Sequence, residues 1–238
     1  MKIALLGYGK MGKEIEQVAL KRGHSVIAKV DVSNAASFSL NELIKADVAI
    51  EFSMPDSAVN NIYKCFEANV PVVVGTTGWL KQLDEVKKKC TDKKQGLFYA
   101  SNFSIGVNVF FEVNKQLAKI MNAYPDYDVS IEEFHHIHKL DAPSGTGLSL
   151  VNQILENLKR KKSWVEHVPT NESELQIISK REGEVPGTHI VRYDSEVDQI
   201  EIKHTAHNRK GFALGAVLAA EFMKGKKGVY GMNDMMRI

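Results

Sequence analysis

The chain contains little cysteine. Only two of its 238 residues, Cys65 and Cys90, are cysteines, and they lie far apart. Two isolated cysteines supply neither the framework of a small disulfide-stapled domain nor the spacing of a cysteine metal site. Free thiols are typical of a reducing compartment, so the sequence predicts a cytoplasmic protein without a structural disulfide.

Long apolar runs and an excess of charge of one sign are also lacking. No segment approaches the ~18 consecutive apolar residues of a membrane span. The apolar run at the N-terminus ends in glycines, which is typical of a first strand and not of a signal peptide. The formal net charge is only +2. The lysine clusters at 87–89 and 159–162 are expected at helix ends, where cations complement the helix dipole. We therefore expect neither a membrane nor a nucleic acid as a partner.

The first hundred residues alternate short β-branched runs with helical patterns. Strands are expected at 2–6, 24–31, 47–53, 71–77 and 97–101, and helices at 10–22, 55–69 and 79–90. Strands separated by helices build βαβ units, whose right-handed crossovers form a parallel, doubly wound sheet. The sequence thus predicts an α/β protein that begins with a Rossmann-like dinucleotide-binding domain.

The pattern changes after Asn102. A helix is expected at 105–122, and strands at 128–134, 174–181, 187–194 and 197–204. Leu148, Val151, Leu155 and Leu158 define one face of a further helix, which the Ser-Gly-Thr turn before them opens. This order predicts an α+β domain with an open mixed sheet. A helix rich in small residues at 211–225 is expected to pack against the first domain, and the tail at 229–238 has no clear period. We therefore assign 1–104 with 211–238 to the dinucleotide-binding domain and 105–210 to a substrate-binding domain.

The motif GYGKMG at 7–12 fits the G-x-G-x-x-G pattern between a predicted strand and a predicted helix. Gly7 permits a tight turn, Gly9 lets the backbone approach a pyrophosphate, and Gly12 lets helix and strand pack closely. Asp31 closes the second strand, where a carboxylate accepts hydrogen bonds from a ribose and favours NADH over NADPH. Lys10 and Lys13 near the helix start would partly neutralise a phosphate. The alternative is a glycine-rich turn that binds no ligand.

The segment EEFHHIHKLDAPSGTG, at 132–147, concentrates three histidines and a lysine within 135–139. Imidazoles titrate near neutral pH, and a helix start binds anions. Ser144, Gly145 and Thr146 precede an apolar helix face and offer hydroxyl and N–H groups. The segment therefore predicts a site that handles protons beside a carboxylate- or phosphate-bearing ligand. If the strand continues, His135 and His136 point to opposite faces.

Two alternatives apply to this segment. Ser144 or Thr146 would act only as a helix N-cap if the neighbouring residues were inert. The H-H-x-H pattern, with Glu132, Glu133 and Asp141 nearby, offers metal ligands. No second cluster of ligands is visible in the sequence, so we expect no metal.

Taken together, these motifs resemble those of the dihydrodipicolinate reductase (4-hydroxy-tetrahydrodipicolinate reductase) family. The resemblance covers nearly the whole chain. It rests on GYGKMG at 7–12, VGTTGW at 74–79, ASNFSIGVN at 100–108, EFHHIHKLDAPSGTG at 133–147 and GFALGA at 211–216.

The resemblance implies a fold, a reaction and an assembly. It implies reduction of 4-hydroxy-tetrahydrodipicolinate, a small dicarboxylate, to tetrahydrodipicolinate in the diaminopimelate route to lysine. NADH or NADPH would deliver a hydride to ring C4. It also implies that the C-terminal helix completes the Rossmann domain, and that the second domain forms a homotetramer.

The resemblance also implies roles for individual residues. His135 and Lys139 match the catalytic, proton-handling pair. The substrate-binding positions correspond to His136, Ser144, Gly145 and Thr146. The cofactor-binding positions correspond to Gly7, Tyr8, Gly9, Lys10, Met11, Gly12, Asp31, Gly75, Thr76, Thr77, Ala100, Ser101, Asn102 and Phe103.

Two other functions remain open on the sequence. One is a different NAD(P)-dependent oxidoreductase with a similar two-domain build, such as an amino-acid or aldehyde dehydrogenase. The other is a nucleotide-binding sensor that binds NADH without substrate-dependent oxidation. Turnover with the expected substrate separates all three.

Overall fold

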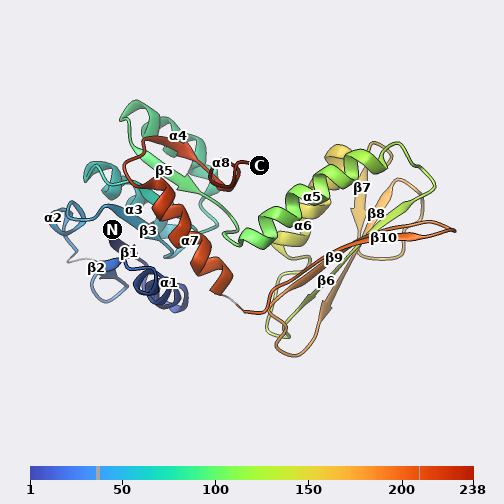
Figure 1. Ribbon diagram of the computed structural model, residues 1–238, viewed down its shortest axis with the longest axis horizontal. Helices are drawn as coiled ribbons and strands as arrows, with labels where there is room; N and C mark the ends of the chain where they lie inside the picture. The colour runs from blue at the N-terminus through green and yellow to red at the C-terminus, as the bar shows by residue number, and fades with distance from the viewer. Residues whose placement is uncertain (36–37, 209) are drawn as a thin grey trace. The chain divides into compact units, whose positions relative to one another are not determined.

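The computed structural model describes residues 1–35, 38–208 and 210–238. The chain divides into two compact units, Met1–Ile105 with Lys210–Ile238, and Gly106–Arg209. Figure 1 labels the elements of both. Each unit has its own sheet and its own hydrophobic core, so we describe each by itself.

The first unit contains a parallel six-stranded sheet in the order β11-β5-β4-β3-β1-β2. The bounds are β1 Lys2–Leu6, β2 Ser25–Val30, β3 Val48–Glu51, β4 Val72–Val74, β5 Gly96–Tyr99 and β11 Gly228–Tyr230. The chain runs outward from β1 to β2 and then returns to the other side of β1 with β3. In such doubly wound sheets, ligands bind at the carboxyl ends of the strands beside this reversal.

Helices cover both faces of this sheet, so its central strands are apolar on both sides. On one face lie α1 (Lys10–Lys21) and α7 (Lys210–Met223), and on the other lie α3 (Pro55–Glu67) and α4 (Leu83–Asp92). Figure 1 shows α7 running beside α1, although the two are far apart in sequence. The small residues of α7 are buried in the same core as Ile15 and Ala19 of α1.

The second unit contains a mixed five-stranded sheet in the order β10-β9-β6-β8-β7. Its strands are β6 Asp128–His135, β7 Ser163–Val165, β8 Glu174–Arg181, β9 Thr188–Asp194 and β10 Gln199–Thr205. The helices α5 (Ile105–Met121) and α6 (Gly145–Asn157) share a core with alternate residues of these strands. This sheet, together with the parallel sheet of the first unit, confirms the predicted fold class.

The predictions missed four short elements and misplaced the start of one helix. The missed elements are α2 (Leu40–Leu43), β7, β11 and α8 (Met232–Met236). The helix expected from Trp79 begins as a 3₁₀ turn at Leu80–Gln82 and becomes α4 only at Leu83. Trp79 itself is buried, and its indole N–H donates to the Thr76 carbonyl at 2.7 Å. The indole also packs edge-on against the Tyr99 ring of β5, so the Trp79 side chain belongs to the core beside the sheet and not to the helix.

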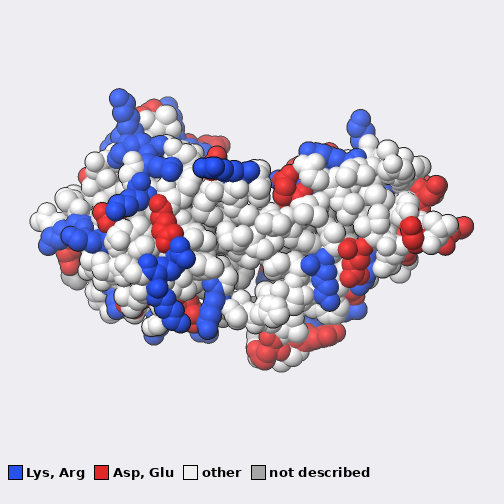
Figure 2. Space-filling model, viewed as in Figure 1, with Lys and Arg blue, Asp and Glu red and all other residues white. Residues whose placement is uncertain are grey.

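The surface carries both signs of charge. Figure 2 shows lysine and arginine side chains interspersed with aspartate and glutamate on the face in view, as the small net charge requires. Among the described residues, none of the helices combines the length and the hydropathy that crossing a membrane demands.

Candidate active site

The turn after β1 is so tight that two of its three glycines cannot be replaced without a clash. A Cβ at Gly7, whose φ is +106°, would lie 2.1 Å from the Phe52 carbonyl oxygen. A Cβ at Gly12 would lie 2.3 Å from the Gly7 carbonyl oxygen, whereas one at Gly9 would meet nothing within 4 Å. Gly7 and Gly12 therefore serve packing. Gly9 borders open space, as it must where a pyrophosphate approaches the backbone.

The start of α1 adds free donors to this turn. Gly9 is the N-cap and provides no side-chain cap, so the first N–H groups of the helix remain available to an anion. Lys10, the first helical residue, is exposed. A pocket of about 250 Å³ is lined by Met11, Phe52, Ser53, Pro55, Gly75, Thr76 and Thr77. Four predicted cofactor residues thus lie together, and this set of groups fits a dinucleotide.

A half-buried aspartate follows β2. Asp31 accepts hydrogen bonds from the Ser33 hydroxyl at 2.6 Å and the Ser33 N–H at 2.8 Å, and these bonds lower the pKa of Asp31. The nearby cation Lys29 is engaged elsewhere. Its Nζ lies 2.6 Å from Glu16 Oε1 and over the Tyr8 ring, and the Tyr8 hydroxyl donates to Glu16. Asp31 therefore remains an anion at the position where a ribose is bound in this fold.

The predicted cofactor segment 100–103 follows β5 and packs against α7. A Cβ at Gly215 of α7 would lie 1.7 Å from the Phe103 carbonyl oxygen, so the two backbones touch. The Ala100 and Phe103 side chains are buried, Asn102 is half-buried and Ser101 is exposed. The Phe103 side chain thus belongs to the core, and its backbone carbonyl packs against α7.

A buried carboxylate organises the second unit. The side chain of Glu133, in β6, is fully buried and accepts hydrogen bonds from the Ser144 N–H (2.9 Å), the Ser144 hydroxyl and the Ser179 hydroxyl (3.0 Å). The Arg181 guanidinium lies 3.5 Å from Glu133 Oε1. Burial alone would raise the pKa of Glu133, but hydrogen bonds from His189 and Ser144 outweigh it and bring the pKa to about 2. Glu133 is therefore an anion at neutral pH.

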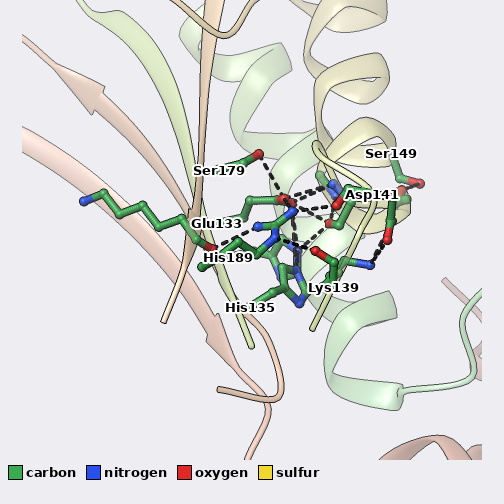
Figure 3. Close-up of polar contacts among 12 residues, drawn as sticks. Glu133, His135, Lys139, Asp141, Ser149, Ser179 and His189 are labelled. Carbon is green, nitrogen blue, oxygen red and sulfur yellow. Dashed lines mark hydrogen bonds and ion pairs between the residues drawn. The ribbon is translucent and has the colours of Figure 1, made fainter. Parts of the chain in front are cut away.

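His135 lies beside this anion, two residues along the same strand. Its Nε2 is 3.4 Å from the Nε2 of His189, a residue of β9, and 3.9 Å from Glu133 Oε2. Burial, followed by repulsion from His189, lowers the pKa of His135 to about 4. Figure 3 shows His135 and His189 converging on Glu133, with Lys139 and Asp141 bonded to each other nearby.

The Lys139 side chain forms an ion pair with Asp141. Its Nζ donates to both carboxylate oxygens of Asp141, each at 2.8 Å, and this contact lowers the pKa of Asp141. Arg181 donates to the carbonyl oxygens of Lys139 and Asp141, which fixes the backbone of the loop. Lys139 is thus a positioned cation on the loop that leaves β6.

The start of α6 has the expected N-terminal geometry. Ser144 is the N-cap, and its Oγ accepts from the Gly147 N–H at 3.0 Å. The same hydroxyl donates to the buried Glu133 carboxylate. In this structure the Ser144 side chain therefore acts as the helix N-cap, which was the alternative to substrate binding. A Cβ at Gly145 would meet nothing within 4 Å, and Thr146 is half-buried. The helix start is therefore open at Gly145.

The other two histidines of the cluster differ from His135. His136 follows the last residue of β6 and is half-buried, and its Nδ1 is buried without a hydrogen-bond partner among the described residues. His138 is exposed and lies 3.2 Å from Glu184. In the described part of the chain, His138 contacts neither Glu133 nor His189, so it does not belong to the cluster around Glu133.

A metal site was the alternative for this cluster. Within the described residues, the group that could hold an ion is Glu133, His135 and His189, whose ligand atoms lie within 4.8 Å of one another. It includes only one histidine of the H-H-x-H pattern. Both oxygens of Glu133 already accept hydrogen bonds, and Arg181 lies beside them, which disfavours a second cation. That the site holds no metal stays a prediction.

Sequence reasoning considered Glu133 only as a metal ligand, and it gave no role in the site to His189 and Arg181, or to Phe52 and Ser53 in the first unit. One signal was available: Glu133 and His135 are two apart on a predicted strand and must share a face. His189 had no such signal, because its place opposite Glu133 depends on the register of β6 against β9.

Acidification is expected to destabilise the substrate-free protein. The pKa of His135 is lowered from 6.5 to about 4, so the unfolded chain binds the proton more readily. The stability that this difference contributes is present above pH 6.5 and is lost as the pH falls towards 4. The lowered pKa of Glu133 likewise contributes stability that is lost as the pH falls from 4.5 to about 2. Calorimetry should therefore give a lower Tm at pH 4.5 than at pH 7, and a smaller difference in His135→Gln. An equal or larger difference in that variant would contradict the assignment to His135.

Comparison with known proteins reveals similarity along the whole chain. The family model for the N-terminus of dihydrodipicolinate reductase matches residues 1–103, and the model for its C-terminus matches residues 106–236. These two matches together include every residue predicted for the site.

Individual relatives agree with this. The chain is 49% identical over 236 residues to the 4-hydroxy-tetrahydrodipicolinate reductase of Christiangramia forsetii, covering 99% of this chain and 98% of the relative. It is 35% identical over 251 residues to the enzyme of that name from Clostridium tetani, covering 99% and 97%. A solved structure, the dipicolinate-bound dihydrodipicolinate reductase from Paenisporosarcina sp. TG-14, superposes with a TM-score of 0.77 at 25% identity and covers 98% of each chain.

Proposed function

This chain belongs to the dihydrodipicolinate reductase family, and on that basis we propose that it reduces 4-hydroxy-tetrahydrodipicolinate to tetrahydrodipicolinate with a nicotinamide cofactor. The reaction is a step of the diaminopimelate route to lysine. The observation that carries the proposal is the cluster in the second unit, where a positioned lysine, a buried histidine and an open helix start lie on one short segment. An acid–base reaction on a small dicarboxylate needs this combination.

The first unit supplies the cofactor site in this proposal. When bound there, a nicotinamide cofactor would supply the hydride for C4 of the ring. The Gly9 backbone and the first N–H groups of α1 would hold the pyrophosphate, and Asp31 the ribose. Met11 and 75–77 would line the nicotinamide end of the pocket.

The second unit supplies the substrate site. The helix start at Gly145 and Thr146 would bind a ring carboxylate, because a helix N-terminus favours anions. His136 would add a contact to the same group. As hydride addition places negative charge on the conjugated imine, the Lys139 ammonium would stabilise that charge and donate the proton. Asp141, which holds Lys139 in the substrate-free protein, would keep that ammonium in place.

Oligomeric state and location belong to the same proposal and rest on the family resemblance. We expect a cytoplasmic homotetramer built through the second unit. Light scattering coupled to gel filtration measures the assembly directly, and a monomer at micromolar concentration would contradict it.

A coupled assay tests the function. The substrate is generated from pyruvate and aspartate semialdehyde, and NADH or NADPH absorbance is followed. We expect absorbance loss that depends on both precursors and that survives exhaustive chelation. Binding of NADH without absorbance loss would favour the sensor, and loss of activity that zinc restores would revive the metal site.

Cofactor preference gives a separate prediction. Asp31 should favour NADH, because a 2′-phosphate would meet its carboxylate. Replacing Asp31 by serine is expected to raise the ratio of kcat/KM for NADPH to that for NADH by about tenfold, the effect of ~1.4 kcal/mol. The matched control is Asp92→Ser, an exposed carboxylate at the end of α4. An unchanged ratio in Asp31→Ser would mean that Asp31 does not lie at the ribose.

A further inference from the structure

The second sheet places His189 directly against His135. Glu133 and His189 are opposite residues in the antiparallel pairing of β6 with β9. The rings of His135 and His189 have centroids 5.1 Å apart and are inclined by 72°. His189 is 4% exposed, so its contacts are with protein and not with bulk water.

The hydrogen bonds around His189 indicate where its proton lies. The Ser144 hydroxyl has one proton, which it donates to Glu133, so its oxygen can only accept from His189 Nε2, 3.2 Å away. Glu133 Oε2, 3.6 Å from the same nitrogen, is also only an acceptor. His189 Nδ1 is buried and has no partner among the described residues. A proton on Nδ1 would be a buried donor without an acceptor, so the network favours the Nε2–H tautomer.

This tautomer constrains His135. With a proton on His189 Nε2, shared between Ser144 Oγ at 3.2 Å and His135 Nε2 at 3.4 Å, the His135 nitrogen faces a donor and is suited to accept. Neutral His135 then carries its proton on Nδ1. The described residues offer Nδ1 no hydrogen bond, and this atom is not among the fully buried ones that lack a partner. Nδ1 is therefore the nitrogen that water or a ligand can reach.

Gly187, the residue before β9, keeps this edge of the ring clear. A Cβ at Gly187, whose φ is +152°, would lie 3.1 Å from His135 Cε1 and 3.4 Å from its Nδ1. The charged and titratable groups around the His135 ring are Glu133 on its own strand, Lys139 on the following loop, Arg181 on β8 and His189 on β9. Of these, His189 lies nearest to Nε2, at 3.4 Å, and Glu133 Oε2 follows at 3.9 Å.

We propose that His189 is a positioning residue for His135. The Nε2–H of His189 faces the Nε2 of His135 and so holds His135 as the Nδ1–H tautomer. In this tautomer, His135 presents a hydrogen-bond donor to the substrate. His135 would then stabilise developing negative charge by donation from Nδ1, while the transferred proton comes from Lys139. The role of His135 in the reaction rests on the proposed function. The tautomer is a property of the substrate-free protein.

The first test is the ¹⁵N spectrum of histidine in the substrate-free protein, since a protonated and an unprotonated ring nitrogen have different chemical shifts. We expect His135 to be protonated on Nδ1 and His189 on Nε2. In His189→Gln the amide N–H can take the place of Nε2–H, so His135 should keep its tautomer. In His189→Asn the shorter side chain does not reach, and His135 should become a mixture. A wild-type His135 protonated on Nε2 would overturn the proposal even if neither variant folded, and it would do so whether or not the protein turns over the substrate.

Kinetics give the second test. His189→Asn is expected to lower kcat by about tenfold, as for a misaligned catalytic hydrogen bond, and His189→Gln to restore most of it, with KM for the cofactor unchanged in both. The matched control is His204→Asn on β10, a residue packed against Phe110 and not bonded to His135, which should retain wild-type kcat. An equal loss in all three variants would assign His189 a purely structural role and sink the proposal.

Discussion

Replacing Lys139 by alanine is expected to lower kcat by about a thousandfold, within the range that general acid catalysis contributes. Lys139 carries the ammonium closest in sequence to the substrate-binding helix start, and its Nζ is already fixed by two hydrogen bonds to Asp141. Alanine removes the cation that would stabilise charge on the reduced imine, and it also removes the proton that neutralises this charge. Steady-state assays with saturating cofactor measure the loss directly.

Two comparisons make this result interpretable. Lys139→Arg keeps the positive charge but holds its proton too strongly to donate it, so recovery by arginine would indicate charge stabilisation and continued loss would indicate proton transfer. Lys180→Ala is the matched control, because Lys180 pairs with Glu132 and not with the cluster around Glu133. NADH affinity should be unchanged in Lys139→Ala. A collapse of NADH binding in that variant would refute the division of roles between the two units.

The parts of the fold that were predictable are those whose pattern is local. The run Val72–Val74 is apolar at every position because helices cover both faces of its sheet, and such a run shows directly in the sequence. The strand β11 has only three residues, and its existence depends on hydrogen bonds with β5, more than a hundred residues earlier. Such an element has too few residues to show a period, so sequence reasoning left the tail unassigned.

The same distinction explains which site residues were found. His135, Lys139 and Gly145 lie within eleven residues of one another, and their density alone marked the segment. Glu133 lies in the same segment but was considered only as a possible metal ligand, because nothing local indicates that two serines, an arginine and a histidine converge on it. The place of His189 in the site depends on the pairing register of β9 with β6. A shift of that register by one residue would turn the His189 side chain to the other face of the sheet.

Two substitutions in the glycine turn of the first unit should separate cofactor binding from folding, and the one at Gly9 has a large expected effect on binding. Gly9→Val is expected to weaken NADH binding by about a hundredfold, or ~2.7 kcal/mol, with the Tm of the cofactor-free protein nearly unchanged. The reason is that a Cβ at Gly9 meets no protein atom within 4 Å and extends into the space that the pyrophosphate would occupy.

Gly12→Ala should do the reverse: its Cβ would lie 2.3 Å from the Gly7 carbonyl oxygen, so the loss appears first in the Tm. Fluorescence titration with NADH and thermal unfolding of both variants measure the two effects. If Gly9→Val bound NADH as tightly as the wild type, the open space beside Gly9 would have another use, and the assignment of the first unit as the cofactor domain would lose its structural basis.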